Sequence, residues 1–299
     1  MKIGFHSGAF FAHPLTEVIP RLAALGYQGI ELNAQTFPLF GPHVTPELSA
    51  EGRAEIRHLA GDHAMELSSI SAHNFSLVSL VDPDHRERQR HLDYIKGCID
   101  LATDVGTDIV HVVAGHPPDG VSREQAWGWL LEGLATCIHY AAEQDVALAL
   151  EAVVGSIVAN MSDLSRLLAD LGEDKLYVNF DPSHLVVADE DPAEWVKALG
   201  PLIVHLHVKD ARKIPAGFEF PPLPEGTMRV TTEFEYLRLG KGVIDFGAMV
   251  GALREIGYEG FLSMEYEELF FGYKEDPWEV AVQTKSFLDN LLSIPDATC

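Results

Sequence analysis

The chain has 299 residues, 47% of them hydrophobic, and a formal net charge of −24. A surface this acidic repels phosphate backbones and anionic membranes, so the composition argues against nucleic acid and membranes as partners. The chain has no apolar run of about eighteen residues, no signal-peptide pattern and only three scattered cysteines. We therefore expect a cytoplasmic protein without disulfide bonds, folded as one domain over residues 1–299.

Short β-branched, apolar runs alternate with amphipathic segments along the whole chain, which is typical of a parallel sheet built from βα units. Eight such pairs, with a last helix over about 277–292, predict a closed (β/α)8 TIM barrel. A doubly wound open sheet is the alternative, but residues 4–8 lack the glycine spacing of a dinucleotide-binding turn. The predicted strands begin near Lys2, Gln28, Glu66, Asp108, Val146, Leu176, Leu202 and Phe261.

An unusually long segment, of about 58 residues, separates the start of the seventh predicted strand from that of the eighth. Its part over 214–226 is too rich in proline to form a regular element. We expect residues 211–240 to form a long loop over the catalytic face of the barrel. Three roles stay open for this loop: it could be a lid, it could contact another subunit, or it could have no function of its own.

Four polar residues close the fifth to eighth predicted strands, which are otherwise apolar. The carboxyl-terminal ends of barrel strands converge on one face, so these side chains are expected to meet there. Three carboxylates and an imidazole would be costly to bring together without a cation. The oxygen-rich set favours one divalent metal, Mn²⁺, Mg²⁺ or Co²⁺, with Zn²⁺ also compatible. The predicted metal ligands are Glu151, Asp181, His207 and Glu265.

A second group of polar residues lies in or just after predicted strands, and we take it as a candidate substrate-binding set. Each histidine has a structural alternative, as a buried residue that supports the site. A surface position is the ordinary alternative for the lysine and the arginine, which could bind hydroxyls or a phosphate. The set consists of His6, His73, His111, His184, Lys209 and Arg212.

Five motifs extend over nearly the whole chain: residues 26–32, 148–151, 181–184, 207–210, and 239–246 leading through 257–260 to 263–265. In these motifs the chain resembles the xylose isomerase-like barrel superfamily, in particular its sugar phosphate isomerase/epimerase branch. The resemblance implies that the four predicted ligands bind one divalent metal, commonly Mn²⁺. It also implies that Glu151 and Glu265 perform acid/base catalysis on opposite faces of the substrate, and that His184 and Arg212 contact substrate oxygens.

This arrangement indicates proton-transfer chemistry on a ketose-like, polyhydroxylated substrate. A metal that binds a ketone oxygen and the neighbouring hydroxyl lowers the cost of an enediolate when a carboxylate removes the adjacent proton. Returning the proton to the opposite face of the same carbon gives epimerisation, and returning it to the neighbouring carbon gives isomerisation. We therefore predict a metal-dependent sugar isomerase or epimerase.

Two other functions stay open. A lyase, either an inosose-type dehydratase or an enzyme that cleaves 3-oxo-glycosides or C-glycosides, would expel a leaving group from the same intermediate. Aromatic residues that could cover an aglycone motivate it, and such an enzyme could need a partner subunit. A non-catalytic sugar-binding barrel is the other alternative, although binding alone does not need two glutamates. The aromatic residues are Phe218, Phe220, Phe270, Phe271 and Tyr273.

The superfamily also includes DNA-repair endonucleases that hold three zinc ions. Those require an Asp-x-His pair beyond the seventh strand, and no histidine lies between Arg212 and Gly242. That absence and the net charge both disfavour a nuclease. The resemblance further implies a homo-oligomer, commonly a dimer or tetramer, while the identity of the sugar stays undetermined.

Overall fold

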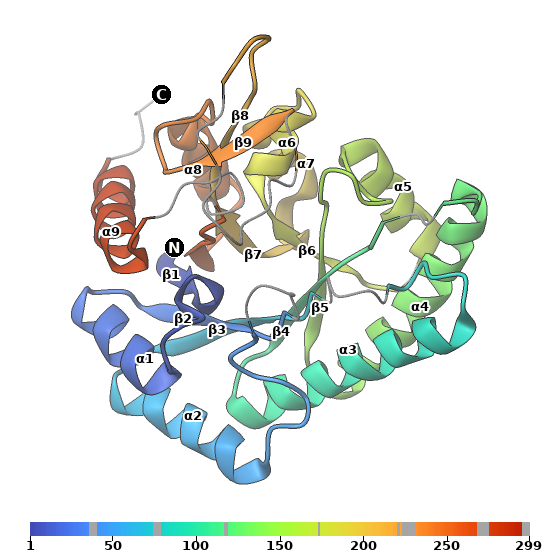
Figure 1. The fold of residues 1–299 in the computed structure, drawn as a ribbon, viewed down its shortest axis with the longest axis horizontal. Coiled ribbons are helices and arrows are strands. Elements are labelled where there is room, and N and C mark those ends of the chain that lie inside the picture. The colour runs from blue at the N-terminus through green and yellow to red at the C-terminus, as the bar shows by residue number, and fades with distance from the viewer. Residues whose placement is uncertain are drawn as a thin grey trace.

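The computed structural model describes residues 1–35, 41–73, 79–116, 119–172, 174–219, 222, 231, 233–267 and 275–294. Its eight parallel strands form a closed barrel in which the last strand pairs with the first (Figure 1). The predicted TIM barrel is confirmed, and each strand begins within a residue of its expected start. The strands are β1 (Lys2–His6), β2 (Gly29–Asn33), β3 (Glu66–Ser71), β4 (Ile109–Val113), β5 (Ala147–Glu151), β6 (Tyr177–Phe180), β7 (Ile203–Val208) and β10 (Phe261–Met264).

Helices lie outside the strands and cover the barrel (Figure 1). Their starts follow from capping residues: the Ser122 side chain accepts a hydrogen bond at the start of α4, and Asp191 does so for α7. The helices are α1 (Leu15–Ala24), α2 (Ala50–Asp62), α3 (His85–Val105), α4 (Arg123–Glu143), α5 (Met161–Leu171), α6 (Pro182–Val187), α7 (Pro192–Leu199), α8 (Phe246–Glu255) and α9 (Pro277–Ser293), with 3-10 turns η1 (Ser7–Phe10) and η2 (Gly200–Leu202).

The hydrophobic core lies between the strands and the helices around them. Val110, Leu148 and Leu150 on the strands are buried together with helix residues such as Ile99 and Leu134. Parallel barrel strands are covered on both faces, which explains why they read as apolar runs in the sequence. The buried polar residues inside the barrel are therefore exceptions that need an explanation.

We expected residues 211–240 to form one long loop, but the segment between β7 and β10 contains regular structure. Two strands within it, β8 (Asp210–Lys213) and β9 (Phe234–Leu237), pair as an antiparallel hairpin beside α6 (Figure 1). Phe234 and Tyr236 pack with Ala211 on one face of the hairpin. The described part of 214–226 forms no helix or strand, and the rest of that stretch lies outside the described residues.

Asp210, the last residue of the motif over 207–210, links it to the motif over 239–246, because the Asp210 carboxylate accepts hydrogen bonds from the backbone of the second motif. The donors are the N–H groups of Gly242 (2.8 Å) and Ile244 (3.3 Å), and the N–H of the neighbouring Ala211 also donates (2.9 Å). A Cβ atom at position 242 would lie 2.1 Å from Asp210 Oδ1 and 2.4 Å from the Ala211 carbonyl oxygen. Position 242 therefore requires glycine, and the motif over 239–246 is explained in part by this anchor.

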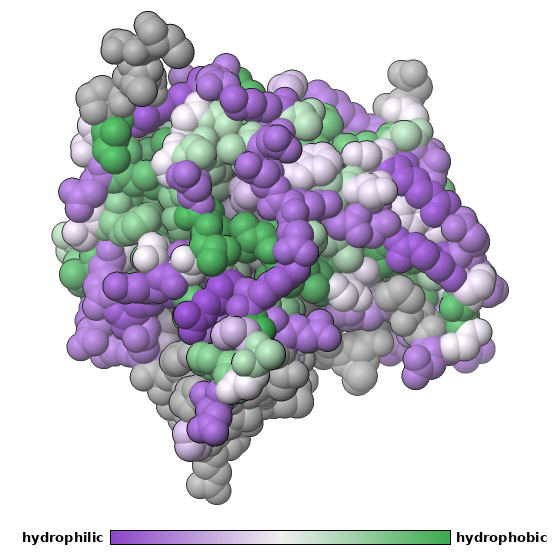
Figure 2. Space-filling model, turned by 90° about the horizontal axis from the view of Figure 1, so that it is seen from above, coloured by the Kyte–Doolittle hydropathy of each residue, from purple (hydrophilic) through white to green (hydrophobic). Residues whose placement is uncertain are grey.

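The surface carries mostly hydrophilic residues on the face shown in Figure 2, with a smaller hydrophobic area near its centre. This agrees with the strongly acidic composition of the chain. Among the residues that the structure describes, no helix combines the length and the apolar character needed to cross a bilayer.

One buried histidine on α3 lies apart from the barrel interior. His91 is 3% exposed, and its Nδ1 has no hydrogen-bond partner among the described residues. Burial lowers the pKa of His91 from its ordinary 6.5 to about 4. The folded state therefore holds this side chain neutral, whereas the unfolded chain protonates it as the pH falls below 6.5.

We expect His91 to make the fold sensitive to acid between pH 6.5 and pH 4. Stability from this residue is fully present above pH 6.5 and is lost as the pH falls toward 4, by up to about 3 kcal/mol. Urea unfolding at pH 7 and pH 4.5 checks this, because His91→Leu should lose less stability across that interval than the wild type. His58→Leu, at an exposed position on α2, is the control. An equal pH dependence in all three proteins would contradict the assignment.

Candidate metal centre

The four predicted metal ligands come together at the carboxyl-terminal end of the barrel. Glu151 ends β5, Asp181 follows β6, His207 lies in β7 and Glu265 follows β10. These strands are neighbours in the barrel, and one ligand atom from each residue lies within 4.8 Å of the others. All four side chains are buried. We call this group the carboxylate cage.

Electrostatics within the cage favour a positive charge at its centre. The Nδ1 atom of His207 lies 3.4 Å from Glu151 Oε2 and 3.3 Å from Glu265 Oε2. Burial is the largest influence and alone would raise the pKa of both carboxyls, but His207, together with His184 at Glu151 and Lys209 at Glu265, holds each pKa well below its usual value. For His207 itself, burial is outweighed by the surrounding carboxylates, so its pKa is raised. Both glutamates are therefore ionised.

Asp181 offers an oxygen that suits a cation. Its Oδ1 accepts a hydrogen bond from the backbone N–H of Ser183 at 2.7 Å, because Asp181 also caps α6. Its Oδ2 is buried and makes no hydrogen bond of good geometry with a described residue, but the Lys209 ammonium lies 3.0 Å from it. A buried carboxylate oxygen that already faces a cation is of the type that binds a divalent metal.

Lys209 lies inside the cage and is not a surface residue. Its Nζ is 3.0 Å from Asp181 Oδ2 and 2.6 Å from both Glu265 Oε2 and Glu267 Oε2, and it lies over the Tyr236 ring. Burial would lower the pKa of Lys209, but the three carboxylates raise it well above its ordinary value. Lys209 is thus a buried cation, close enough to the cage to contact whatever binds there.

His184 lies at the edge of the cage, as expected from its position in the turn after Asp181. Its Nε2 is 3.4 Å from Glu151 Oε1 and 3.6 Å from Asp181 Oδ2. The Tyr236 hydroxyl lies 3.2 Å from its Nδ1. The hairpin therefore supplies a side chain that orients His184, which the sequence analysis did not foresee.

The other three histidines lie within the barrel. His73 Nε2 is 2.9 Å from His111 Nδ1 and 3.7 Å from Glu151 Oε2. His6 Nδ1 accepts a hydrogen bond from the Gly8 N–H, and its ring centroid is 6.1 Å from that of His207. Burial lowers the pKa of His73 to about 3, with His111 adding to the effect, so His73 is neutral. Substrate contacts by these histidines stay a prediction.

Arg212 is outside the carboxylate cage. It lies on β8, where its Nε donates to Glu235 Oε1 at 2.7 Å, and its guanidinium lies 5.5 Å from the centre of the Phe218 ring. Its side chain is 38% exposed. An ion pair with Glu235 already engages the guanidinium. The predicted contact of Arg212 with substrate oxygens stays a prediction.

Four polar residues near the cage had no predicted role: three are buried, and the fourth, Glu267, has a side chain that is 20% exposed. Asn179 Nδ2 donates to Glu151 Oε2 at 2.9 Å, and Glu31 contacts His207 from within the barrel. A signal was available for both, since a charged or amide side chain in the middle of an apolar strand is an exception. Tyr236 and Glu267 carried less signal, because they lie in or beyond irregular segments. The four residues are Glu31, Asn179, Tyr236 and Glu267.

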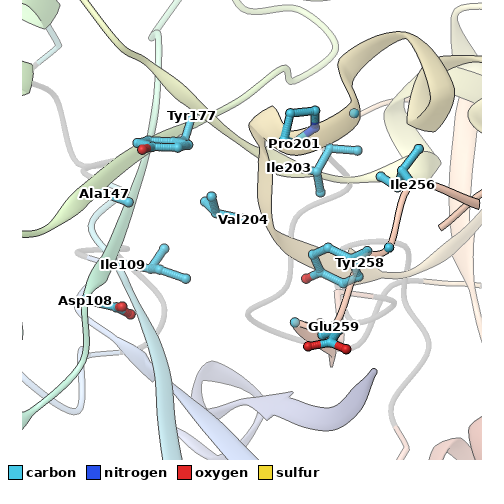
Figure 3. A pocket seen from close by; sticks show the side chains of 13 residues that line it. Asp108, Ile109, Ala147, Tyr177, Pro201, Ile203, Val204, Ile256, Tyr258 and Glu259 are labelled. Atoms are coloured by element: carbon cyan, nitrogen blue, oxygen red, sulfur yellow. The ribbon is translucent and has the colours of Figure 1, made fainter. Parts of the chain in front are cut away.

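Two surface cavities open at the opposite end of the barrel. The one in Figure 3 has a volume of about 430 Å³ and is lined by residues at strand starts, including Ile109, Tyr177 and Ile203. The other, of about 620 Å³, lies next to it and shares Tyr177. Active sites of TIM barrels lie at the carboxyl-terminal ends of the strands, so we assign the chemistry to the cage and not to these cavities.

The fold and the cage together define a TIM barrel with a candidate metal site at its catalytic end. The chain belongs to the xylose isomerase-like TIM barrel family, whose model matches residues 19–288. This confirms the superfamily indicated by the sequence motifs.

Relatives of the chain are sugar-modifying enzymes. It is 24% identical over 275 residues to fructoselysine 3-epimerase of Shigella flexneri, covering 90% of this chain and 91% of that one. It is 29% identical over 174 residues to inosose dehydratase of Lacticaseibacillus casei, covering 58% of this chain and 57% of the relative. The chain thus spans little more than half the length of the inosose dehydratases that it matches.

Solved structures share the fold over almost the whole chain. A D-tagatose 3-epimerase-like protein has a TM-score of 0.74 at 22% identity, covering 98% of this chain and 97% of its own. An IolI protein with a bound zinc atom has a TM-score of 0.74 at 20% identity, covering 98% of each chain. The likeness to these two structures shows that the chain shares their barrel fold.

Proposed function

We propose that this protein is a divalent-metal-dependent sugar isomerase or epimerase that acts on a ketose-like, polyhydroxylated substrate. The observation that carries the proposal is the carboxylate cage, in which two ionised glutamates from different strands flank the same histidine. When bound to the cage, a divalent cation would stabilise the negative charge that develops on a substrate oxygen. The donor set suits Mn²⁺, and the zinc atom in the IolI structure supports a divalent ion.

The two glutamates supply the proton transfers. One carboxylate, Glu151 or Glu265, removes the proton from the carbon next to the substrate carbonyl. In isomerisation, the carboxyl group so formed returns its proton, after exchange with solvent, to the neighbouring carbon. In epimerisation, the other glutamate must take up a proton from solvent before it delivers one to the opposite face of the same carbon. Because both pKa values lie well below the usual range, either side chain is available as the base.

Lys209 and His184 complete the proposed site. The Lys209 ammonium lies 2.6 Å from Glu265 and keeps that carboxylate oriented, while adding positive charge where substrate oxygens would bind. His184 lies against Glu151 and is braced by the Tyr236 hydroxyl, so it can donate to a substrate hydroxyl in a defined direction. Among the relatives, the match over 90% of the chain to an epimerase supports this reading.

The same site supports a second candidate, a lyase of the inosose dehydratase type. Elimination of a hydroxyl needs a positive charge or a proton donor beside the leaving oxygen, and Lys209 between Glu265 and Glu267 supplies one. The dehydratase relatives point the same way. Phe220, Phe270, Phe271 and Tyr273, which motivated a glycoside-cleaving enzyme, lie outside the described residues.

Substrate profiling in D₂O tests the proposal. The Mn²⁺-loaded protein is incubated with ketohexoses, sugar phosphates, inososes and 3-oxo-glycosides, and each product is analysed by NMR after the metal is removed. We expect deuterium at a carbon next to a carbonyl, together with an isomeric product. Loss of water or release of an aglycone would assign the lyase. No exchange with any substrate, with metal bound, would contradict both enzymes and favour a sugar-binding barrel.

A further inference from the structure

We infer that Glu31 is a positioning residue that fixes the ring tautomer of His207, so that the Nδ1 lone pair faces the carboxylate cage. The inference rests on the proposed metal centre. Glu31 lies in β2 on the far side of His207 from the cage and is completely buried. Its Oε1 and Oε2 lie 3.1 and 3.2 Å from His207 Nε2.

The two nitrogens of His207 face different carboxylates, while the Asn179 amide nitrogen lies 3.3 Å from Nδ1 and 3.5 Å from Nε2. Nε2 meets Glu31, whereas Nδ1 faces Glu151 and Glu265 at 3.4 and 3.3 Å. A neutral imidazole has one N–H and one lone pair, and a carboxylate can only accept a hydrogen bond. The proton of a metal-binding His207 must therefore lie on Nε2, which leaves the Nδ1 lone pair for the cation.

Glu31 is itself held firmly, as a positioning residue must be. The Ser263 hydroxyl donates to Glu31 Oε2 at 2.7 Å, and His111 Nε2 donates to Oε1. His73 Nε2 lies 2.9 Å from His111 Nδ1, and Gln35 Nε2 lies 3.3 Å from His73 Nδ1. In this series of hydrogen bonds Gln35 donates to His73, His73 donates to His111, and His111 donates to Glu31. Each ring then uses one N–H and one lone pair, as a neutral histidine has.

A second metal site is the competing role for these residues, since one ligand atom each of Glu31, His111, His205 and His207 lies within 4.8 Å of the others. A cation there would break hydrogen bonds that are already well made. His205 Nδ1 donates to Asn179 Oδ1 at 2.9 Å, and its Nε2 lies 3.3 Å from Ser69 Oγ. Glu31 accepts from three partners, so hydrogen bonding explains the group without a second ion.

The first test needs no substitution. The full-length protein, labelled with ¹⁵N-histidine and titrated with Zn²⁺, is examined by NMR for the protonation of both His207 nitrogens. We expect binding of one equivalent of Zn²⁺, a proton on Nε2 that exchanges slowly with water, and metal on Nδ1. Zinc on Nε2 with a proton on Nδ1 would overturn the inference while leaving the metal centre in place.

The second test measures metal affinity. Glu31→Gln replaces the carboxylate by a neutral amide of the same shape, and we expect its Kd for Zn²⁺ and Mn²⁺ to rise about 10- to 100-fold. The matched control is Glu235→Gln, which alters an equally buried carboxylate on the hairpin and should leave Kd unchanged. Wild-type affinity in Glu31→Gln would overturn the inference alone. Absence of metal binding by the wild type would overturn the proposed function as well.

Discussion

Replacing Glu265 by glutamine is expected to slow deuterium exchange into the substrate about 100- to 10,000-fold, which is the usual contribution of a catalytic base. The amide keeps the shape of the carboxylate and its contact with Lys209 but cannot take up a proton. Glu151→Gln should lose exchange to a similar extent, because each proposed proton transfer needs one of the two carboxylates. The loss should appear mainly in kcat, since the substitution leaves Lys209 and His184, the proposed substrate contacts, in place.

The measurement is the rate of deuterium incorporation in D₂O, followed by NMR at saturating metal. Because both glutamates also belong to the metal cage, the metal Kd of each variant has to be measured in parallel. Glu66→Gln, at the amino-terminal end of β3, is the control and should exchange at the wild-type rate. Wild-type exchange in Glu151→Gln or Glu265→Gln would refute the assigned catalytic roles.

Asp181→Asn is expected to weaken Mn²⁺ binding on the order of 100-fold or more, since loss of a direct ligand should exceed the loss of its supporting contacts. The asparagine Oδ1 can still accept from Ser183, so the cap of α6 survives. Its amide nitrogen then replaces Oδ2, the buried oxygen that lies 3.0 Å from the Lys209 ammonium. An amide N–H at that position has no lone pair for the metal and repels it electrostatically.

Thermal or urea unfolding with and without metal provides the readout. Metal at 100 times its Kd should stabilise the wild type by about 2.7 kcal/mol, and a chelator should remove that increment. Asp181→Asn should show almost no increment at the same metal concentration. If Mn²⁺ stabilised the variant as much as the wild type, Asp181 would not be a ligand.

The sequence was sufficient to predict the barrel and the members of the cage. Parallel strands that are buried on both faces produce apolar runs, so the positions of these runs in the sequence predict where the strands lie. The polar residues that end these runs, such as Glu151 and His207, then converge because every strand of a barrel ends on the same face. Both predictions need only the apolar runs and the residues that end them, and both features can be recognised within short segments of the sequence.

What the tertiary structure decided concerns contacts between residues far apart in the sequence. The hairpin brings Tyr236 to His184, and the barrel closure brings Glu31 of β2 to His207 of β7. The sequence left a surface position open for Lys209, yet the folded chain surrounds it with three carboxylates. Such pairings depend on which side chains point into the barrel at the same height, and side-chain direction and barrel register are determined only when the barrel closes.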